Sequence, residues 1–195
     1  MRRLHRPECP NTTALRNNYK HPENKLALQQ ASYGKCMYCE SYISNVYFGD
    51  VEHIRPKAQD KYPELEFTWT NHGFCCARCN NAKSDQFDED CPLLDPYSED
   101  PSIHILAFGS LLRNKRGSER GAITISTIEL NRVELVERRA IRINELQNAI
   151  DACYRTSSAV VRNTLLTALA HESDPDKEYS MVAAALIEAN QPEQN

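Results

Sequence analysis

The chain has 195 residues, of which 41% are hydrophobic and 26% charged, with a formal net charge of −4. This composition predicts a folded globular protein and excludes a disordered tail or a fibrous repeat. The sequence has no apolar run long enough to cross a membrane and no apolar segment after its basic start, so we expect a cytoplasmic protein.

The charge is unevenly divided along the chain. Residues 1–83 carry 12 Lys and Arg against 8 Asp and Glu, a net charge of +4. Residues 84–195 carry 11 against 19, a net charge of −8. A surface that meets phosphate groups is therefore predicted in the first half of the chain.

The first residues are predicted to form an arm followed by a helix. Residues 1–21 are polar and basic and contain two prolines, which favours an extended arm. A helix is predicted from about Glu23 to Tyr33, because Pro22 suits a first helical position and Gly34 suits the end of a helix.

The middle of the chain alternates short strands with loops. A helix is expected to begin near Asn80, and residues 85–100 hold seven acidic and no basic residues, which predicts a loop. β-branched and aromatic residues predict strands over 42–46, 51–54, 103–106 and 123–125.

The last third is predicted to be helical. Asn131 and Glu134 have the spacing of a capping box, and apolar residues then recur every three, four or seven positions as far as Cys153. Glu134 is expected to pair with Arg138 one turn later. Two more helices are predicted, over 158–171 and after Pro175.

Four of the eight cysteines form two C-x-x-C pairs, Cys36 with Cys39 and Cys76 with Cys79. Without an export signal, such pairs favour a metal site over disulfides. Two pairs can complete a tetrahedron of thiolates around a structural Zn²⁺. The alternative is four buried free cysteines, and Cys75 could replace its neighbour Cys76 as a ligand.

An acid and a histidine lie together inside the insert that the two cysteine pairs enclose, in the segment G-D-V-E-H-I-R-P-K at 49–57. Side chains of successive strand residues point to opposite faces, so Glu52 and His53 can share a site only if the strand bends or ends there. Pro56 favours such an end. Histidine suits a general base near neutral pH, and carboxylate and amide oxygens suit Mg²⁺.

This segment, Asn71 and the later C-A-R-C-N-N-A-K-S-D together resemble the HNH endonuclease family over about residues 34–86. The resemblance implies an α+β fold with a zinc-bound ββα-metal core. It implies that His53 deprotonates a water that attacks the scissile phosphate, and that Glu52 and Asn80 bind a catalytic Mg²⁺ or Mn²⁺. Asn71 would orient the histidine through backbone contacts, and Asp50 would support the metal ligands from outside.

Basic residues near these motifs are candidates for contact with the phosphate backbone. A solvated charged surface is the alternative for each of them, and a zinc module that binds nucleic acid without cutting it is the alternative for the whole core. The candidates are Arg55, Lys57, Arg78 and Lys83.

Shorter and less specific motifs in the C-terminal half resemble the HNH subunit of Septu-type anti-phage systems, including the retron-associated ones. They are L-D-P at 94–96, E-D-P at 99–101, R-G at 120–121 and L-N-R at 130–132, and the initial M-R-R-L is also similar. The resemblance implies an ABC-type ATPase as partner. The chain has no G-x-x-x-x-G-K-[ST] loop of its own, so the ATPase would act in trans.

We therefore expect three segments: an arm and helix over 1–33, a nuclease core over 34–90, and a mainly helical region over 91–195 that docks the partner. The acidic loop and the C-terminal helices are the candidate docking surfaces. A stand-alone restriction-like or homing-type nuclease is the alternative function, and the sequence does not distinguish DNA from RNA as substrate.

Overall fold

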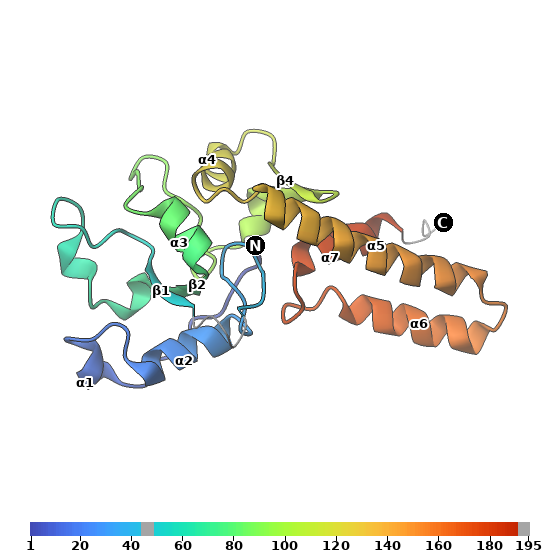
Figure 1. Ribbon diagram of the computed structural model, residues 1–195, viewed down its shortest axis with the longest axis horizontal. Coiled ribbons are helices and arrows are strands. Elements are labelled where there is room, and N and C mark those ends of the chain that lie inside the picture. The colour runs from blue at the N-terminus through green and yellow to red at the C-terminus, as the bar shows by residue number, and fades with distance from the viewer. Residues whose placement is uncertain (44–48, 191–195) are drawn as a thin grey trace.

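The computed structural model describes residues 1–43 and 49–190, and it combines helices with two separate two-stranded antiparallel sheets (Figure 1). The predicted α+β class is thus confirmed. In chain order the elements are α1 (Thr12–Leu15), α2 (Pro22–Ala31), β1 (Asp50–His53), β2 (His72–Cys75), α3 (Ala77–Lys83), β3 (Ile105–Phe108), β4 (Leu111–Asn114), α4 (Glu119–Thr127), α5 (Val133–Arg155), α6 (Ala159–His171) and α7 (Ser180–Ala189).

Most predicted elements are confirmed. The helix predicted after Pro22 is α2, the strand predicted over 51–54 is β1, and the three C-terminal helices are α5, α6 and α7. The strand predicted over 42–46 lies largely outside the described residues. The helix expected near Asn80 begins three residues earlier, at Ala77.

One strand prediction is wrong, because residues 123–125 lie inside α4. Ser118 caps this helix by accepting a hydrogen bond from the backbone N–H of Gly121. The hydroxyl of Thr124 accepts a hydrogen bond from Leu94 N at 3.0 Å, which ties the helix to a segment thirty residues away. These contacts outweigh the strand preference of the isoleucines on either side of Thr124.

The strands β1 and β2 form an antiparallel hairpin that lies between two helices, and with α3 they make up the ββα unit. β1 pairs with β2 in a register that sets Val51 opposite Phe74 and His53 opposite His72. One face of this hairpin packs Val51 and Phe74 against Leu28 of α2. The hairpin lies between α2 and α3 in the ribbon (Figure 1), so its second face is turned toward α3.

The turn of the first C-x-x-C pair, from Cys36 to Cys39, lies directly on β2; we call it the first cysteine turn. Met37 N donates to Phe74 O at 2.9 Å, and a Cβ atom on Gly73 would stand 2.2 Å from the Met37 sulfur. A side chain at position 73 would therefore push the turn away from the strand. Glycine at this position lets the two C-x-x-C pairs approach each other.

A single large apolar cluster joins the predicted segments. It includes Leu4 from the arm, Ile54 from the core and Ile105, Leu135 and Val182 from the C-terminal region. The arm is docked rather than free, because Leu4 N donates to Pro96 O at 2.8 Å. The core and the C-terminal region consequently support each other through shared burial.

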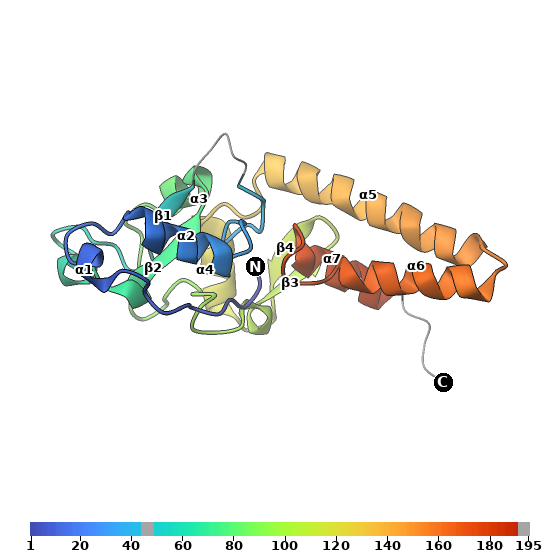
Figure 2. The ribbon, with the colours of Figure 1, turned by 90° about the horizontal axis from the view of Figure 1, so that it is seen from below.

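Beyond this cluster, α5 and α6 extend away from the rest of the molecule (Figure 2). α5 and α6 run side by side as an antiparallel pair (Figure 2), and Leu146, Ile150 and Leu169 are buried between the helices of this part. No helix in the described residues is long and apolar enough to span a membrane.

The predicted capping box at the start of α5 does not form. The N-cap residue is Arg132, without a side-chain cap hydrogen bond. Asn131 instead bonds to both backbone groups of Leu112 at 2.8 Å, which joins β4 to the start of α5. A long-range backbone partner has thus replaced the local one that the spacing suggested.

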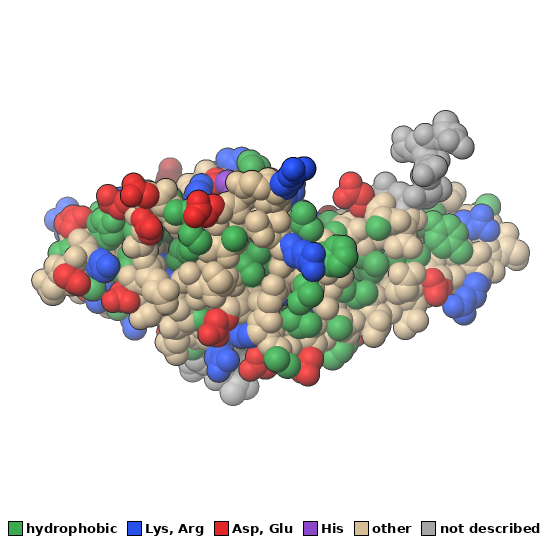
Figure 3. All heavy atoms as spheres, turned by 90° about the horizontal axis from the view of Figure 1, so that it is seen from above, with side chains coloured by type: hydrophobic (Ala, Val, Ile, Leu, Met, Phe, Trp, Pro, Cys, Tyr) green, Lys and Arg blue, Asp and Glu red, His purple; other side chains and the backbone are tan. Residues whose placement is uncertain are grey.

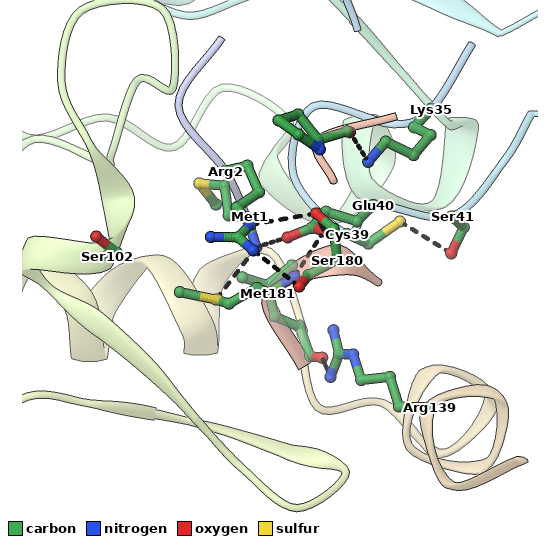
Figure 4. Close-up of polar contacts among 12 residues, drawn as sticks. Met1, Arg2, Lys35, Cys39, Glu40, Ser41, Ser102, Arg139, Ser180 and Met181 are labelled. Atoms are coloured by element: carbon green, nitrogen blue, oxygen red, sulfur yellow. Dashed lines mark hydrogen bonds and ion pairs between the residues drawn. The ribbon is translucent and has the colours of Figure 1, made fainter. Parts of the chain in front are cut away.

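A buried polar cluster connects the first cysteine turn to α7 (Figure 4). Glu40, which follows Cys39, forms an ion pair with the amino group of Met1 and accepts hydrogen bonds from Ser180 Oγ and Met181 N at 2.9 and 3.2 Å. Burial raises the pKa of Glu40, but the positive charges of Met1 and Lys35 outweigh it and lower this pKa to about 2. Burial also lowers the pKa of the amino group.

We expect Glu40→Gln to destabilise the protein by about 3 kcal/mol near pH 7, because it leaves the buried amino group without its counter-charge. Glu40 is ionised in the folded state down to a pKa of about 2, compared with 4.5 unfolded. Its contribution is therefore complete above pH 4.5 and is lost as the pH falls toward 2. Urea unfolding of the zinc-loaded proteins at pH 7 should show this stability gap, and equal stability of Glu40→Gln and wild type would contradict the ion pair.

Candidate active site

The four cysteines of the two C-x-x-C pairs converge on one point. The sulfurs of Cys36, Cys39, Cys76 and Cys79 all lie within 4.8 Å of one another. Tetrahedral zinc thiolates, with Zn–S bonds of about 2.3 Å, need sulfurs about 3.8 Å apart, so the cluster fits Zn²⁺ after a small contraction. Cys75 is not part of the cluster, since its sulfur faces Glu52 Oε2 at 3.9 Å. The geometry therefore favours Cys76 as the ligand.

An arginine from the C-terminal region reaches this cluster. Arg132 Nη1 lies 3.5 Å from the sulfur of Cys79. Four thiolates around one Zn²⁺ carry a net charge of −2, which a guanidinium hydrogen bond partly offsets. The start of α5 is in this way tied to the cysteine cluster.

A cavity of about 430 Å³ lies beside β1. Glu52 and His53 come from opposite faces of the strand, as the alternation of side chains requires, yet both line this cavity at the point where the strand ends. Asn80 of α3 and Lys57 of the following loop line it as well. The structure thus brings together the acid, the histidine, the second asparagine and one of the four predicted cations.

Glu52 is 1% exposed, and its carboxylate forms an ion pair with Lys83. Lys83 Nζ lies 2.8 Å from Glu52 Oε1 and donates to the backbone O of His53 at 2.8 Å. Burial raises the pKa of Glu52, and the charge of Lys83 opposes that rise. Lys83 therefore holds the acid and the backbone of the histidine in one place.

The prediction that Lys83 contacts nucleic acid does not fit this position. The residue is 1% exposed, and its ammonium group is committed to Glu52 and to the backbone of His53. Sequence reasoning classed it with surface cations because its partner lies thirty-one positions away.

We expect Lys83→Met to lower the free energy of unfolding by about 3–5 kcal/mol, because it leaves a buried carboxylate unpaired. Urea unfolding of the zinc-loaded protein at pH 7 measures the loss. The double variant Glu52→Gln/Lys83→Met removes both charges and should recover a large part of it. Equal stability of Lys83→Met and wild type would show that the pair is not formed.

His53 is held by a backbone carbonyl. Its Nε2 lies 3.0 Å from Glu66 O, which can only accept, so Nε2 carries the proton and Nδ1 carries the lone pair. His72 Nε2 donates to the same oxygen at 2.9 Å. Burial lowers the pKa of His53 and lowers that of His72 to about 4. His53 is therefore neutral near pH 7 and able to accept a proton.

Asn71 positions the segment that follows His53. Its Oδ1 accepts from Arg55 N at 2.8 Å, and its Nδ2 donates to Arg55 O at 2.9 Å and to Leu65 O at 3.3 Å. Asn71 is 5% exposed and does not line the cavity. Its side chain thus fixes the backbone two residues after His53, and its role in orienting the histidine stays a prediction.

Asn80 and Asp50 are the other two residues that the resemblance assigned to the metal site. Asn80 lies on α3 immediately after Cys79 and lines the cavity, and Asp50 opens β1 on the same strand face as Glu52. The carboxylate and amide oxygens of Glu52 and Asn80 are hard donors of the kind Mg²⁺ prefers. Glu52 Oε1 pairs with Lys83, and Glu52 Oε2 lies 3.9 Å from the Cys75 thiol.

The remaining predicted cations lie in different surroundings. Lys57 lines the cavity and pairs with Glu66 at 2.8 Å. Arg55 is exposed, with its guanidinium 5.4 Å from the rings of both Tyr62 and Phe87. Arg78 is exposed and pairs with Glu134 at 3.5 Å.

Glu134 was expected to pair with Arg138, but in the structure it pairs with Arg78. Glu134 reaches across to α3 instead of along its own helix. Arg78 does not line the cavity.

Several residues that line the cavity were not singled out by the sequence analysis, and two of them come from the N-terminal arm. Tyr19 and Lys20 follow α1 and line the cavity, and the Tyr19 ring contacts that of His53. The basic composition of the arm was the only signal, because no motif connects these positions to the cysteine pairs.

Comparison with known proteins agrees with this geometry. Residues 36–86 match the family model of the HNH endonuclease. Septu protein PtuB of Bacillus thuringiensis is 31% identical over 186 residues, which cover 87% of this chain and 70% of that protein. Septu protein PtuB of Bacillus mycoides (strain KBAB4) is 30% identical over 151 residues, which cover 63% of this chain and 51% of that protein.

The two kinds of match cover different lengths of the chain. The HNH match takes in both cysteine pairs, the acid, the histidine and both asparagines. The match to the Bacillus thuringiensis protein extends far beyond this core and includes most of the C-terminal region. The chain therefore belongs to the Septu PtuB family and carries an HNH endonuclease domain over residues 36–86.

Proposed function

We propose that this protein is a metal-dependent endonuclease that hydrolyses phosphodiester bonds of nucleic acid. The observation that carries the proposal is that Glu52, His53, Lys57 and Asn80 line one cavity. A neutral base, a cation and oxygen ligands for a divalent ion are groups that can promote this reaction. The HNH match over residues 36–86 supports the same reaction.

The residues divide the chemistry among themselves. His53 takes a proton from water at Nδ1, the water oxygen attacks phosphorus, and the bond to the leaving oxygen breaks. Lys57 offers its ammonium group to a non-bridging oxygen. A Mg²⁺ or Mn²⁺ ion held by Glu52 and Asn80 would supply positive charge for the phosphate oxygens. The zinc site contributes by fixing α3, which carries Asn80.

The test is cleavage of end-labelled single- and double-stranded DNA and RNA by the zinc-loaded protein, with Mg²⁺ or Mn²⁺ added or omitted. The ion is omitted rather than chelated, because a chelator would also remove zinc. Asn80→Ala should lose activity, while Asn163→Ala, an exposed asparagine of α6, should keep it. Binding without cleavage under all these conditions, with the partner absent or present, would favour a non-catalytic zinc module.

We further propose that the nuclease is the effector of a cytoplasmic Septu-type anti-phage system and works with an ABC-type ATPase. Membership of the PtuB family supports this assignment. Hydrophobic side chains reach the surface over the elongated helical part (Figure 3), and Val160 and Leu166 of α6 are 76% and 42% exposed. Such exposed apolar side chains are a candidate docking surface.

Co-expression with the product of the neighbouring ATPase gene tests the partner. The two proteins should co-purify, and Val160→Asp with Leu166→Asp should separate them without changing the melting temperature. Thr164→Asp, also exposed on α6, is the matched control for added charge. A chain that remains alone would favour a stand-alone nuclease.

A further inference from the structure

Tyr19 lies against the proposed general base. It belongs to the segment between α1 and α2 and lines the same cavity as His53. The centroid of its ring lies 4.6 Å from that of His53, with an interplanar angle of 71°, which is an edge-to-face contact. The ring also packs on the apolar cluster of Leu28, Val51 and Phe74.

The imidazole of His53 is held on more than one side. The hydrogen bond to Glu66 O fixes the protonated nitrogen but permits the ring to tilt about that bond. His72 contacts the imidazole at 4.8 Å and 87°, and Tyr19 makes the second ring contact. Edge-to-face ring contacts are attractive only in certain geometries, so the two contacts together favour one ring orientation.

The same tyrosine ring contacts the cation of the site. Lys57 Nζ lies 4.8 Å from the Tyr19 centroid, within the range of a cation–π interaction, and pairs with Glu66 at 2.8 Å. Tyr19 and Glu66 therefore contact both His53 and Lys57, the base and the phosphate-binding cation of the proposed reaction.

We propose that Tyr19 is a positioning residue of the nuclease site, whose ring holds the imidazole of His53 in the orientation set by its hydrogen bond to Glu66. This inference rests on the proposed function, because it concerns the group that accepts the proton. It assigns a role in the reaction to the segment N-terminal to α2, which lies outside the HNH match over residues 36–86.

The experiment compares Tyr19→Leu with Tyr19→Phe in single-turnover cleavage of the best nucleic-acid substrate. Tyr19→Leu keeps apolar volume but removes the ring, and we expect the rate at saturating protein to fall about tenfold with less than a threefold change in affinity. Tyr19→Phe keeps the ring and should restore the rate. Tyr154→Leu, an exposed tyrosine of α5, is the matched control.

A spectroscopic measurement separates positioning from general stability. Long-range ¹H–¹⁵N correlation spectra report which ring nitrogen carries the proton, and His53→Gln identifies the His53 signals. Wild type and Tyr19→Phe should show the Nε2–H tautomer, and Tyr19→Leu a mixture of both tautomers. If Tyr19→Leu does not fold, Tyr19→Met replaces it in both measurements.

The outcomes distinguish the two proposals. A wild-type protein that cuts none of the substrates would refute the nuclease and, with it, the role of Tyr19. An active wild type accompanied by an equally fast Tyr19→Leu, or by unchanged His53 signals in that variant, would refute the role of Tyr19 alone. A slower Tyr19→Leu with mixed tautomers supports the inference.

Discussion

Replacing Cys39 or Cys76 with serine is expected to unfold the nuclease core. Removing one of four thiolates weakens zinc binding, and zinc binding at structural sites is worth about 10–16 kcal/mol at neutral pH. The whole stability of a domain is about 5–15 kcal/mol. The loss of the metal can therefore outweigh everything else that holds Cys36, β2 and α3 together.

The measurement is zinc content after gel filtration, followed by thermal unfolding monitored by circular dichroism. Cys75→Ala is the matched control, because this cysteine is buried beside Cys76 but lies outside the cluster. It should retain one zinc per chain and melt close to wild type. Full zinc content in Cys76→Ser, or loss of zinc in Cys75→Ala, would show that the ligand set is wrong.

The zinc prediction was available from sequence because C-x-x-C is a local pattern. A tight turn brings two sulfurs together, and only the meeting of the two pairs depends on the fold. The helices α5 to α7 were likewise predictable from their apolar periodicity. The strand predicted over 123–125 was wrong because α4 is fixed by the Leu94 and His104 segments, which no local window includes.

The candidate site was predictable to the extent that its residues belong to motifs. Glu52, His53 and Asn80, which the resemblance assigned to one site, line one cavity. The pairing of Glu52 with Lys83 was not predictable, since a charged residue in a sequence carries no sign of its burial. Tyr19 was missed for a related reason: it is placed by the packing of the arm against β1 and β2.

Asn131 shows the same limit in a different setting. Its spacing from Glu134 fits a helix cap, and a local rule assigns it that role. In the structure its amide is bonded to the backbone of Leu112 on β4. Where a side chain can bond either a local or a distant backbone group, the tertiary fold determines which partner it takes.

His53→Ala is expected to reduce the rate of cleavage by about 10²–10⁴-fold, the usual contribution of a general base. The imidazole is 9% exposed and packs on Tyr19 and His72, so some stability is also lost. Rates are therefore compared at a temperature where both proteins are folded, as judged by circular dichroism. His171→Ala, whose side chain is 68% exposed on α6, is the matched control and should cut like wild type.

Added imidazole provides a sharper test of the base. The His53→Ala variant leaves a hole beside a cavity of about 430 Å³, large enough to admit a free imidazole molecule. If His53 accepts the proton, imidazole should restore part of the rate in His53→Ala and leave Asn80→Ala unchanged, because that variant lacks a metal ligand and not a base. Equal cleavage by wild type and His53→Ala would show that another group accepts the proton.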